Sequence, residues 1–359
     1  MASQILAQTE KVHMKMRLLI SSGILAGVMS LTVMATPSLD AQGTPRAASA
    51  VSGDRAALPR TPWGSADLQG TWTSEGELGV PFERPAQFGD RQYLTDAEYA
   101  DRLKQTQVRD ADALAEIDVF TADVSNAGAV GSPTSPPPHW LERSTRSRRT
   151  SLVIDPPNGR IPAAVPAPGR GGGRRGGGPG RGGARDSAAD FSLYDRCITR
   201  GLPGAIFPAI YNANTRIVQG PDTVAITYEM IHETRVVSLD DRTRPPAFRQ
   251  MQGNSRGHWE GDTLVIETTG LLEGMAYRGG SRNQRLVERF RRADADTLRY
   301  ELTVIDPETW TAPWTVALDL KPQASGMFEY ACHEGNYAMR NMLSAVRAEE
   351  AAAAKSGGR

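Results

Sequence analysis

The stretch LVERFRRADADTLRYELTVI, residues 286–305, decides the fold class. It contains two runs, residues 286–292 and 297–305, on either side of the turn sequence ADAD at residues 293–296. In the second run apolar side chains occupy every other position: Leu298, Tyr300, Leu302 and Val304. This period of two is typical of a strand with one apolar face, and a short turn between two such runs predicts an antiparallel hairpin.

The same pattern extends from about residue 215 to residue 332, with turn signals between the runs. Further strand-like runs occupy residues 223–230, 233–239, 259–268, 314–320 and 327–332, and a first strand is predicted at residues 68–73. A sheet of about eight or nine strands curls into a barrel or divides into a sandwich. We therefore predict a mainly β fold, an antiparallel meander that forms a barrel or a strongly curled sheet.

Two helices are expected to pack outside this sheet. The first runs from residue 95 to about residue 115, because Thr95 can cap it and Glu98 can accept a hydrogen bond from the cap backbone. The second follows Asn336 and carries the apolar stripe Met339, Met342, Leu343 and Val346, which is expected to close the barrel. A short strand is also predicted at the start of residues 151–160.

The first 41 residues are typical of a secretory signal. Lys11, Lys15 and Arg17 precede an apolar run over residues 18–35, and small residues lead up to Gln42. An uncleaved membrane anchor is the alternative, because the run is long enough to span a bilayer. We expect a flexible leader over residues 42–58, one domain over residues 59–350, a disordered tail over residues 351–359, and a periplasmic or secreted protein with no membrane span after cleavage.

The charge and the cysteines exclude several classes of protein. Lysine and arginine together number 41, as do aspartate and glutamate, and a Gly/Arg tract at residues 168–185 holds five arginines and no acid. The rest of the mature chain is therefore mildly acidic, and we expect no nucleic-acid binding. Cys197 and Cys332 are either disulfide-bonded or two buried thiols. The sequence contains no cofactor-binding motif, so no cofactor is predicted.

Five motifs resemble a family of uncharacterised exported bacterial proteins. They are TPWG (61–64), DLQGTW (67–72), DRCITRGLPG (195–204), WEGDTLVIET (259–268) and YACHEGNY (330–337). The resemblance covers roughly residues 59–350 and implies no particular activity. The Gly/Arg tract departs from the family pattern and has the character of an insertion. The GTW sequence at residues 70–72 is also similar to the first strand of lipocalin-like barrels.

Two other motifs suggest chemistry. GNSRG at residues 253–257 fits the G-x-S-x-G pattern of serine hydrolases, but that mechanism needs a helix after the serine, and here a hairpin containing Trp259 follows. We therefore favour a glycine-rich strand connection. A zinc site would need His232 and His333 to converge with a third ligand, because neighbours on a strand point to opposite faces. We predict no metal.

Strand parity places charge inside the barrel. Glu288 shares a face with Leu286 and Phe290, so it points inward. A buried carboxylate needs a partner or a proton, and Arg235, on the same face as Val237, can supply the partner. The alternatives are a polar ligand pocket and a structural ion pair inside a filled barrel.

The first functional hypothesis is an exported protein that binds a small organic molecule in a polar-lined barrel pocket. Its polar residues would be Glu288, Arg235, Tyr228, Tyr300 and His232, with Arg196 and His333 brought near by the cysteine bridge. The second hypothesis is a cofactor-free lyase or hydrolase, in which His333 or His232 acts as base and Tyr337 or Tyr300 donates a proton. Glu288 and Arg235 would orient the substrate and stabilise charge in that enzyme. The third is a structural envelope protein without a ligand.

Overall fold

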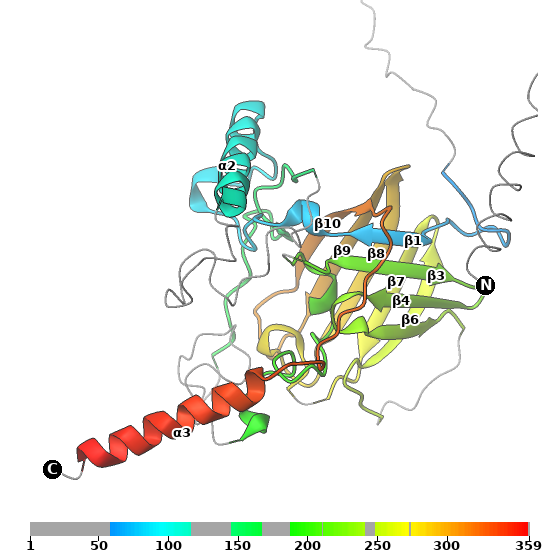
Figure 1. Cartoon of the computed structure of the whole chain (residues 1–359). Helices are drawn as coiled ribbons and strands as arrows, with labels where there is room; N and C mark the ends of the chain where they lie inside the picture. Colours follow the sequence, from blue (N-terminus) through cyan, green and yellow to red (C-terminus); the bar gives the residue numbers. More distant parts are fainter. Residues whose placement is uncertain are drawn as a thin grey trace, which may run out of the picture. The chain divides into compact units, whose positions relative to one another are not determined.

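Nine strands form a closed barrel in the computed structural model, which confirms the mainly β prediction (Figure 1). In order around the barrel they are β1 (Gly70–Thr73), β3 (Asn214–Gln219), β4 (Thr223–Tyr228), β5 (Thr234–Ser238), β6 (Asn254–Glu260), β7 (Thr263–Thr269), β8 (Arg285–Asp294), β9 (Thr297–Ile305) and β10 (Trp314–Pro322). Pairing of Trp72 with Pro322 joins β1 to β10 and closes the barrel. A tenth strand, β2 (Val153–Asp155), pairs with the start of β10.

The structure describes residues 58–115, 145–166, 187–209, 211–240, 248–272 and 274–357. The predicted signal segment, nearly all of the leader and the Gly/Arg tract lie outside these residues.

The alternation in residues 286–305 produces the expected hairpin. Phe290 on β8 lies opposite Tyr300 on β9, and the centres of their two rings are 4.8 Å apart. Every second side chain is fully buried from Leu286 to Phe290 on β8 and from Leu298 to Val304 on β9, and the core includes Leu286, Leu298, Leu302 and Val304. Burying apolar side chains of this size stabilises the fold by about 1.5–3 kcal/mol each.

One strand pair departs from the predicted meander. β5 and β6 run parallel and pair only at Ser238 and Arg256, so the barrel is mixed. At this seam Gly257 has no side chain, and an added Cβ would lie 2.6 Å from Leu239 Cδ2 and 3.1 Å from Val237 Cγ1. Side-chain packing against a glycine therefore replaces most of the backbone pairing between the two strands.

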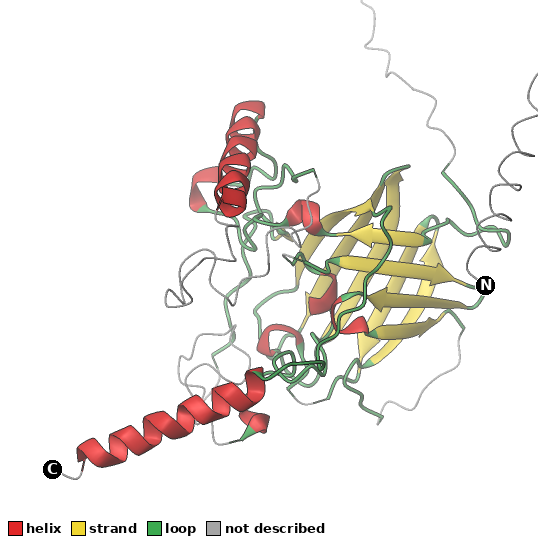
Figure 2. Ribbon diagram, viewed as in Figure 1, coloured by secondary structure: helices red, strands yellow, loops and turns green. Residues whose placement is uncertain are grey.

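The connections that carry short helices lie at one end of the barrel, which we call the β4–β5 end, whereas the tight β3–β4, β6–β7 and β8–β9 turns lie at the other end (Figure 2). Strands β1, β4, β7 and β9 finish there, and the strands after them begin there. The short 3-10 helices of the chain are η1 (Glu75–Glu77), η2 (Ala86–Phe88), η4 (Ala188–Asp190), η5 (Gly204–Ile206), η6 (Met230–His232) and η7 (Tyr277–Gly279). Of these, η5, η6 and η7 belong to connections at this end.

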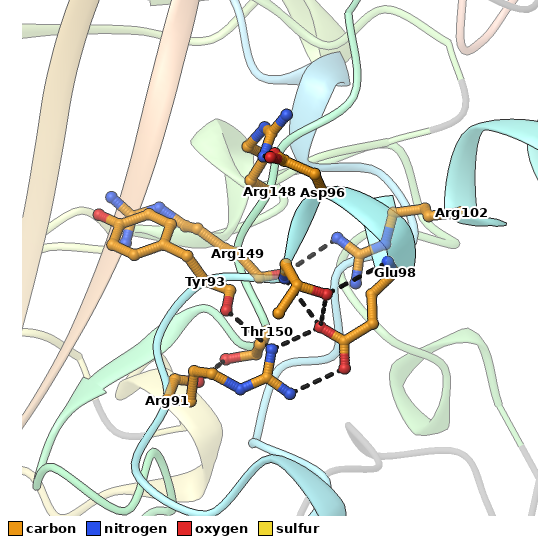
Figure 3. A network of polar contacts seen from close by, with 9 residues as sticks. Arg91, Tyr93, Asp96, Glu98, Arg102, Arg148, Arg149 and Thr150 are labelled. Atoms are coloured by element: carbon orange, nitrogen blue, oxygen red, sulfur yellow. Dashed lines mark hydrogen bonds and ion pairs between the residues drawn. The ribbon is translucent and has the colours of Figure 1, made fainter. Parts of the chain in front are cut away.

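Helix α2 (Asp96–Ala115) begins where the sequence predicts, and its cap is formed. The Glu98 backbone N–H donates to Thr95 Oγ1, and the Thr95 N–H donates to Glu98 Oε2 at 2.8 Å. Arg102 donates to two backbone carbonyls of residues 147–149, which fixes the helix to the segment that leads into β2 (Figure 3). Arg91, Tyr93, Asp96, Arg148 and Thr150 extend this polar network.

Helix α3 (Ala338–Gly357) extends into the residues predicted as a tail. The prediction that it closes the barrel is wrong, because the helix is exposed along its length apart from a half-buried stripe. That stripe consists of the four predicted apolar residues Met339, Met342, Leu343 and Val346. No helix of the described part of the chain is long and apolar enough to cross a membrane.

Residues 327–332 do not form the predicted strand. The segment is held instead by side chains: the Phe328 N–H donates to Glu229 Oε1, and Cys332 forms a disulfide with Cys197. Without a neighbouring strand to pair with, a short alternating run does not form a ladder. The disulfide confirms one of the two alternatives for the cysteines and is consistent with a location outside the cytoplasm.

Candidate ligand-binding site

The predicted charge pair lies inside the barrel. Arg235 of β5 and Glu288 of β8 form a bidentate ion pair, with Nη1–Oε2 and Nη2–Oε1 distances of 2.6 and 2.7 Å. The two side chains are 3% and 0% exposed. Both side chains point into the barrel, as the alternation along their strands predicts. Parallel N–H···O bonds of this kind are among the strongest in proteins.

Two hydroxyl side chains contact the pair, and a third supports one of them. Tyr300 donates to Glu288 Oε1 at 3.0 Å, while Ser255 lies 3.5 Å from Arg235 Nη1 and hydrogen-bonds Thr268 at 2.8 Å. Burial raises the pKa of Tyr300 well above its ordinary value, so its hydroxyl stays protonated. The cluster is therefore neutral in sum and largely satisfied by its own members.

Tyr228 completes the cluster from the end of β4. It is fully buried, and its hydroxyl makes no hydrogen bond among the described residues; the same is true of Arg235 Nε. Burial raises the pKa of Tyr228, an effect that the Arg235 charge partly offsets. No described cavity is lined by these residues.

A cavity of about 220 Å³ lies at the β4–β5 end of the barrel. Its walls come from two segments, residues 192–202 before η5 and residues 274–278 at η7. The side chains with polar groups among its lining residues are Ser192, Tyr194, Thr199, Arg200, Tyr277 and Arg278. Leu193, Leu202, Met275 and Ala276 supply apolar surface. A concave site with a mainly apolar wall and a few polar groups is the usual form of a small-molecule site.

The two arginines of this cavity contact aromatic rings and sulfur. The Arg200 guanidinium lies 5.4 Å from the centre of the Tyr194 ring and 3.3 Å from Met230 Sδ. The Arg278 guanidinium lies 4.2 Å from the centre of the Phe82 ring. Within the described residues neither arginine forms an ion pair with a carboxylate, in contrast to Arg235.

An aromatic cluster lies behind the cavity. Tyr277 stacks on Phe207 with ring centres 5.8 Å apart and also contacts Trp314, which meets Phe82 edge to face. Trp314 is fully buried at the start of β10. The cluster gives the cavity a rigid, apolar support between the barrel core and the connections of the β4–β5 end.

The rim of the cavity is fastened covalently. The disulfide joins Cys197, next to the cavity wall, to the segment that carries Tyr330, whose hydroxyl lies 3.3 Å from that of Tyr194. Tyr211 stacks on Tyr330 at 6.3 Å, and burial raises the pKa values of both phenols, so they stay protonated. These hydroxyl groups therefore act as neutral hydrogen-bonding groups.

Several predicted site residues lie elsewhere. His232 is exposed: β4 ends at Tyr228, and the turn that follows has left-handed backbone at Ile231 and His232, so strand parity does not continue to the histidine. His333 is exposed and Tyr337 is 66% exposed. None of these three side chains contacts the buried pair.

Arg196 is half-buried beside the disulfide, but it is not among the residues that line the cavity. The GNSRG motif lies on β6, and Ser255 points into the barrel, where it hydrogen-bonds Thr268. The strand–turn–helix setting of a serine nucleophile is therefore not present at this motif. Among the described residues no three acidic, histidine or cysteine side chains are grouped to hold a metal ion.

Sequence reasoning missed the cavity arginines. Arg200 lies within the motif DRCITRGLPG, which the sequence analysis singled out. The backbone there is irregular, so no alternation along a strand indicates where the Arg200 side chain points. Arg278 has φ of 54°, and nothing in the sequence indicates this conformation. Comparisons with protein-family models, with curated proteins and with solved structures find no match. The family resemblance therefore stays a prediction, and the site is interpreted from its geometry.

Proposed function

We propose that this chain is an exported protein that binds a small organic molecule in the cavity at the β4–β5 end of the barrel. The observation that carries the proposal is the cavity itself. It lies next to a rigid aromatic cluster and a disulfide, and polar groups line a mainly apolar wall. Closed barrels of about eight strands can hold one small ligand, usually at the mouth or inside. The predicted signal and the disulfide support a periplasmic or secreted location.

This proposal moves the ligand from the predicted interior pocket to the end of the barrel. The Arg235–Glu288 pair is closed on itself and fully buried, which suits a structural role. The acid–base enzyme has less support, because His232 and His333 are exposed and do not contact Glu288. A structural envelope protein would show no ligand binding at all, so a binding experiment separates it from the proposal.

The test fills the cavity with a side chain. Ala276 lines the cavity and is half-buried, so Ala276→Trp should occupy part of it; Ala225→Trp, on the outer face of β4, is the matched control. Native mass spectrometry of the protein, expressed with its predicted signal segment, should show a retained small molecule or binding of one-ring compounds. We expect Ala276→Trp to abolish binding and Ala225→Trp to preserve it. Equal binding by both variants, or no binding by the unmodified chain, would contradict the proposal.

A further inference from the structure

We infer that the ligand of this cavity is a small organic anion, a carboxylate or similar oxyanion on a body of about one ring. The inference rests on the proposed function and adds the chemical class of the ligand. It comes from the charge of the cavity wall, the conformation of Arg278 and the size of the space.

Among the described residues, the cavity wall carries positive side chains and no carboxylate. Its twelve lining residues include two arginines and no aspartate or glutamate. Two carboxylates contact hydroxyl groups of the lining residues: Glu233 accepts from Thr199 Oγ1 at 2.7 Å, and Asp195 accepts from Ser192 Oγ at 2.7 Å. Neither of them forms an ion pair with Arg200 or Arg278, so both guanidinium groups keep donors for an anion that enters the cavity.

Other partly or fully buried arginines of the described chain donate to strong oxygen acceptors. Arg84 and Arg102 donate to backbone carbonyls, Arg235 pairs with Glu288, and Arg149 and Arg299 share Asp319 at 3.0 and 2.6 Å. A partly desolvated guanidinium that lacks such an acceptor is costly, and an incoming oxyanion removes that cost with short, charge-assisted bonds. Arginine presents two parallel donors that match a carboxylate.

The backbone at Arg278 is held in an unfavourable conformation. Its φ and ψ are 54° and 34°, a left-handed region that glycine adopts freely and arginine does not. Strain of this kind persists where the surrounding structure enforces it and is concentrated at functional sites. The Arg278 side chain lines the cavity, and its guanidinium lies 4.2 Å from the centre of the Phe82 ring. An arginine in a backbone conformation that favours glycine is thus expected if its charge is needed at this place.

The size of the cavity limits the ligand. An engineered apolar cavity of about 150 Å³ holds a benzene molecule. The cavity here has about 220 Å³, enough for one ring and a carboxylate, and it opens to solvent. Leu193, Leu202 and Met275 of the cavity wall supply apolar contact for the ring, and Tyr277 adds an aromatic face that stacks on Phe207 behind it.

The experiment compares acids with their neutral amides. Isothermal titration of the full chain would use benzoate, cyclohexanecarboxylate and hexanoate, each beside its amide, at low and high salt. At least one acid should bind about tenfold or more tightly than its amide, which is the scale of a hydrogen bond to a charged group. That preference should shrink with added salt.

Two arginine variants and one control locate the preference. Arg200→Gln and Arg278→Gly should each lower the affinity for the acid about tenfold and leave the affinity for the amide unchanged. Arg291→Gln, at an exposed arginine on β8, should change neither. Arg278→Gly also relieves the strained backbone, so it should unfold at the same or a higher temperature than the unmodified chain. Lost binding in a variant that is no less stable cannot be ascribed to unfolding.

The outcomes separate the two proposals. Equal affinity for acid and amide, lost in Ala276→Trp, would overturn the anion inference and leave the proposed function standing. Acid binding that survives both arginine substitutions would also overturn it. Absence of binding by every acid and amide of the panel at millimolar concentration would overturn this inference, whereas retention of an unrelated neutral molecule in native mass spectrometry would still support the proposed function.

Discussion

Replacing Glu288 by glutamine tests whether the charge pair inside the barrel is structural. Glutamine has the same shape and can still accept from Tyr300, so the change removes the negative charge and leaves the Arg235 guanidinium unpaired at 3% exposure. Removing one partner of a buried pair costs about 3–5 kcal/mol. For a chain of this size, each kcal/mol shifts Tm by roughly 2–4 °C, so we expect a fall of about 6–20 °C.

Thermal and urea unfolding followed by circular dichroism would measure this effect. The control is Glu267→Gln, because Glu267 pairs with Arg285 at 3.1 Å with both side chains more than 40% exposed. An exposed pair contributes about 0–1 kcal/mol, so this variant should resemble the unmodified chain. A double replacement, Glu288→Leu with Arg235→Met, should recover most of the loss.

The result also bears on function. If the free energy of unfolding of Glu288→Gln lies within about 1 kcal/mol of that of the unmodified chain, the pair is not a closed, desolvated unit and the reasoning from its burial is wrong. If stability falls as expected while binding at the β4–β5 end persists at temperatures where the variant is folded, the pair supports the barrel and does not contact the ligand.

Three further predictions concern the seam, the helix cap and the disulfide. Gly257→Ala should cost about 1–3 kcal/mol in urea unfolding, because its Cβ would lie 2.6 Å from a core side chain. Thr95→Ala removes the hydroxyl that accepts from the Glu98 N–H, so it should lower the free energy of unfolding in urea by about 1 kcal/mol. Hydrogen bonds to Arg91 and Thr95 lower the pKa of Glu98 from 4.5 to about 2, so its contribution to stability is complete above pH 4.5 and is lost as the pH falls towards 2; Glu98→Gln should remove that acid dependence. Replacing both Cys197 and Cys332 by serine opens a loop of 135 residues and should cost at most about 5 kcal/mol by chain entropy, measured by thermal unfolding against the unmodified chain.

Local patterns were sufficient to predict most of the barrel. The alternation in residues 297–305 and the capping residues Thr95 and Glu98 act through neighbours in the sequence, and both elements begin where predicted. The inward direction of Glu288 followed from the same alternation, as did its pairing with Arg235. A regular strand transmits direction from one residue to the next, so these inferences needed no knowledge of the rest of the fold.

The failures occurred where regular backbone ends. His232 was assigned to the barrel mouth by parity, but a left-handed turn intervenes. The parallel pairing of β5 with β6 depends on a long connection, and no local pattern encodes it. The cavity is built from residues 192–202 and 274–278, which are far apart in sequence and irregular in structure, so only the assembled fold brings them together.

The contact between β1 and β10 has a consequence for biosynthesis. It joins residues 72–73 to residues 321–322, so β1 lacks one of its two neighbouring strands until residue 322 has left the ribosome. Contacts over such long sequence separations make folding slow. A translocation machine that accepts only unfolded chains would have time to act, because the barrel cannot close before residue 322 has been synthesised.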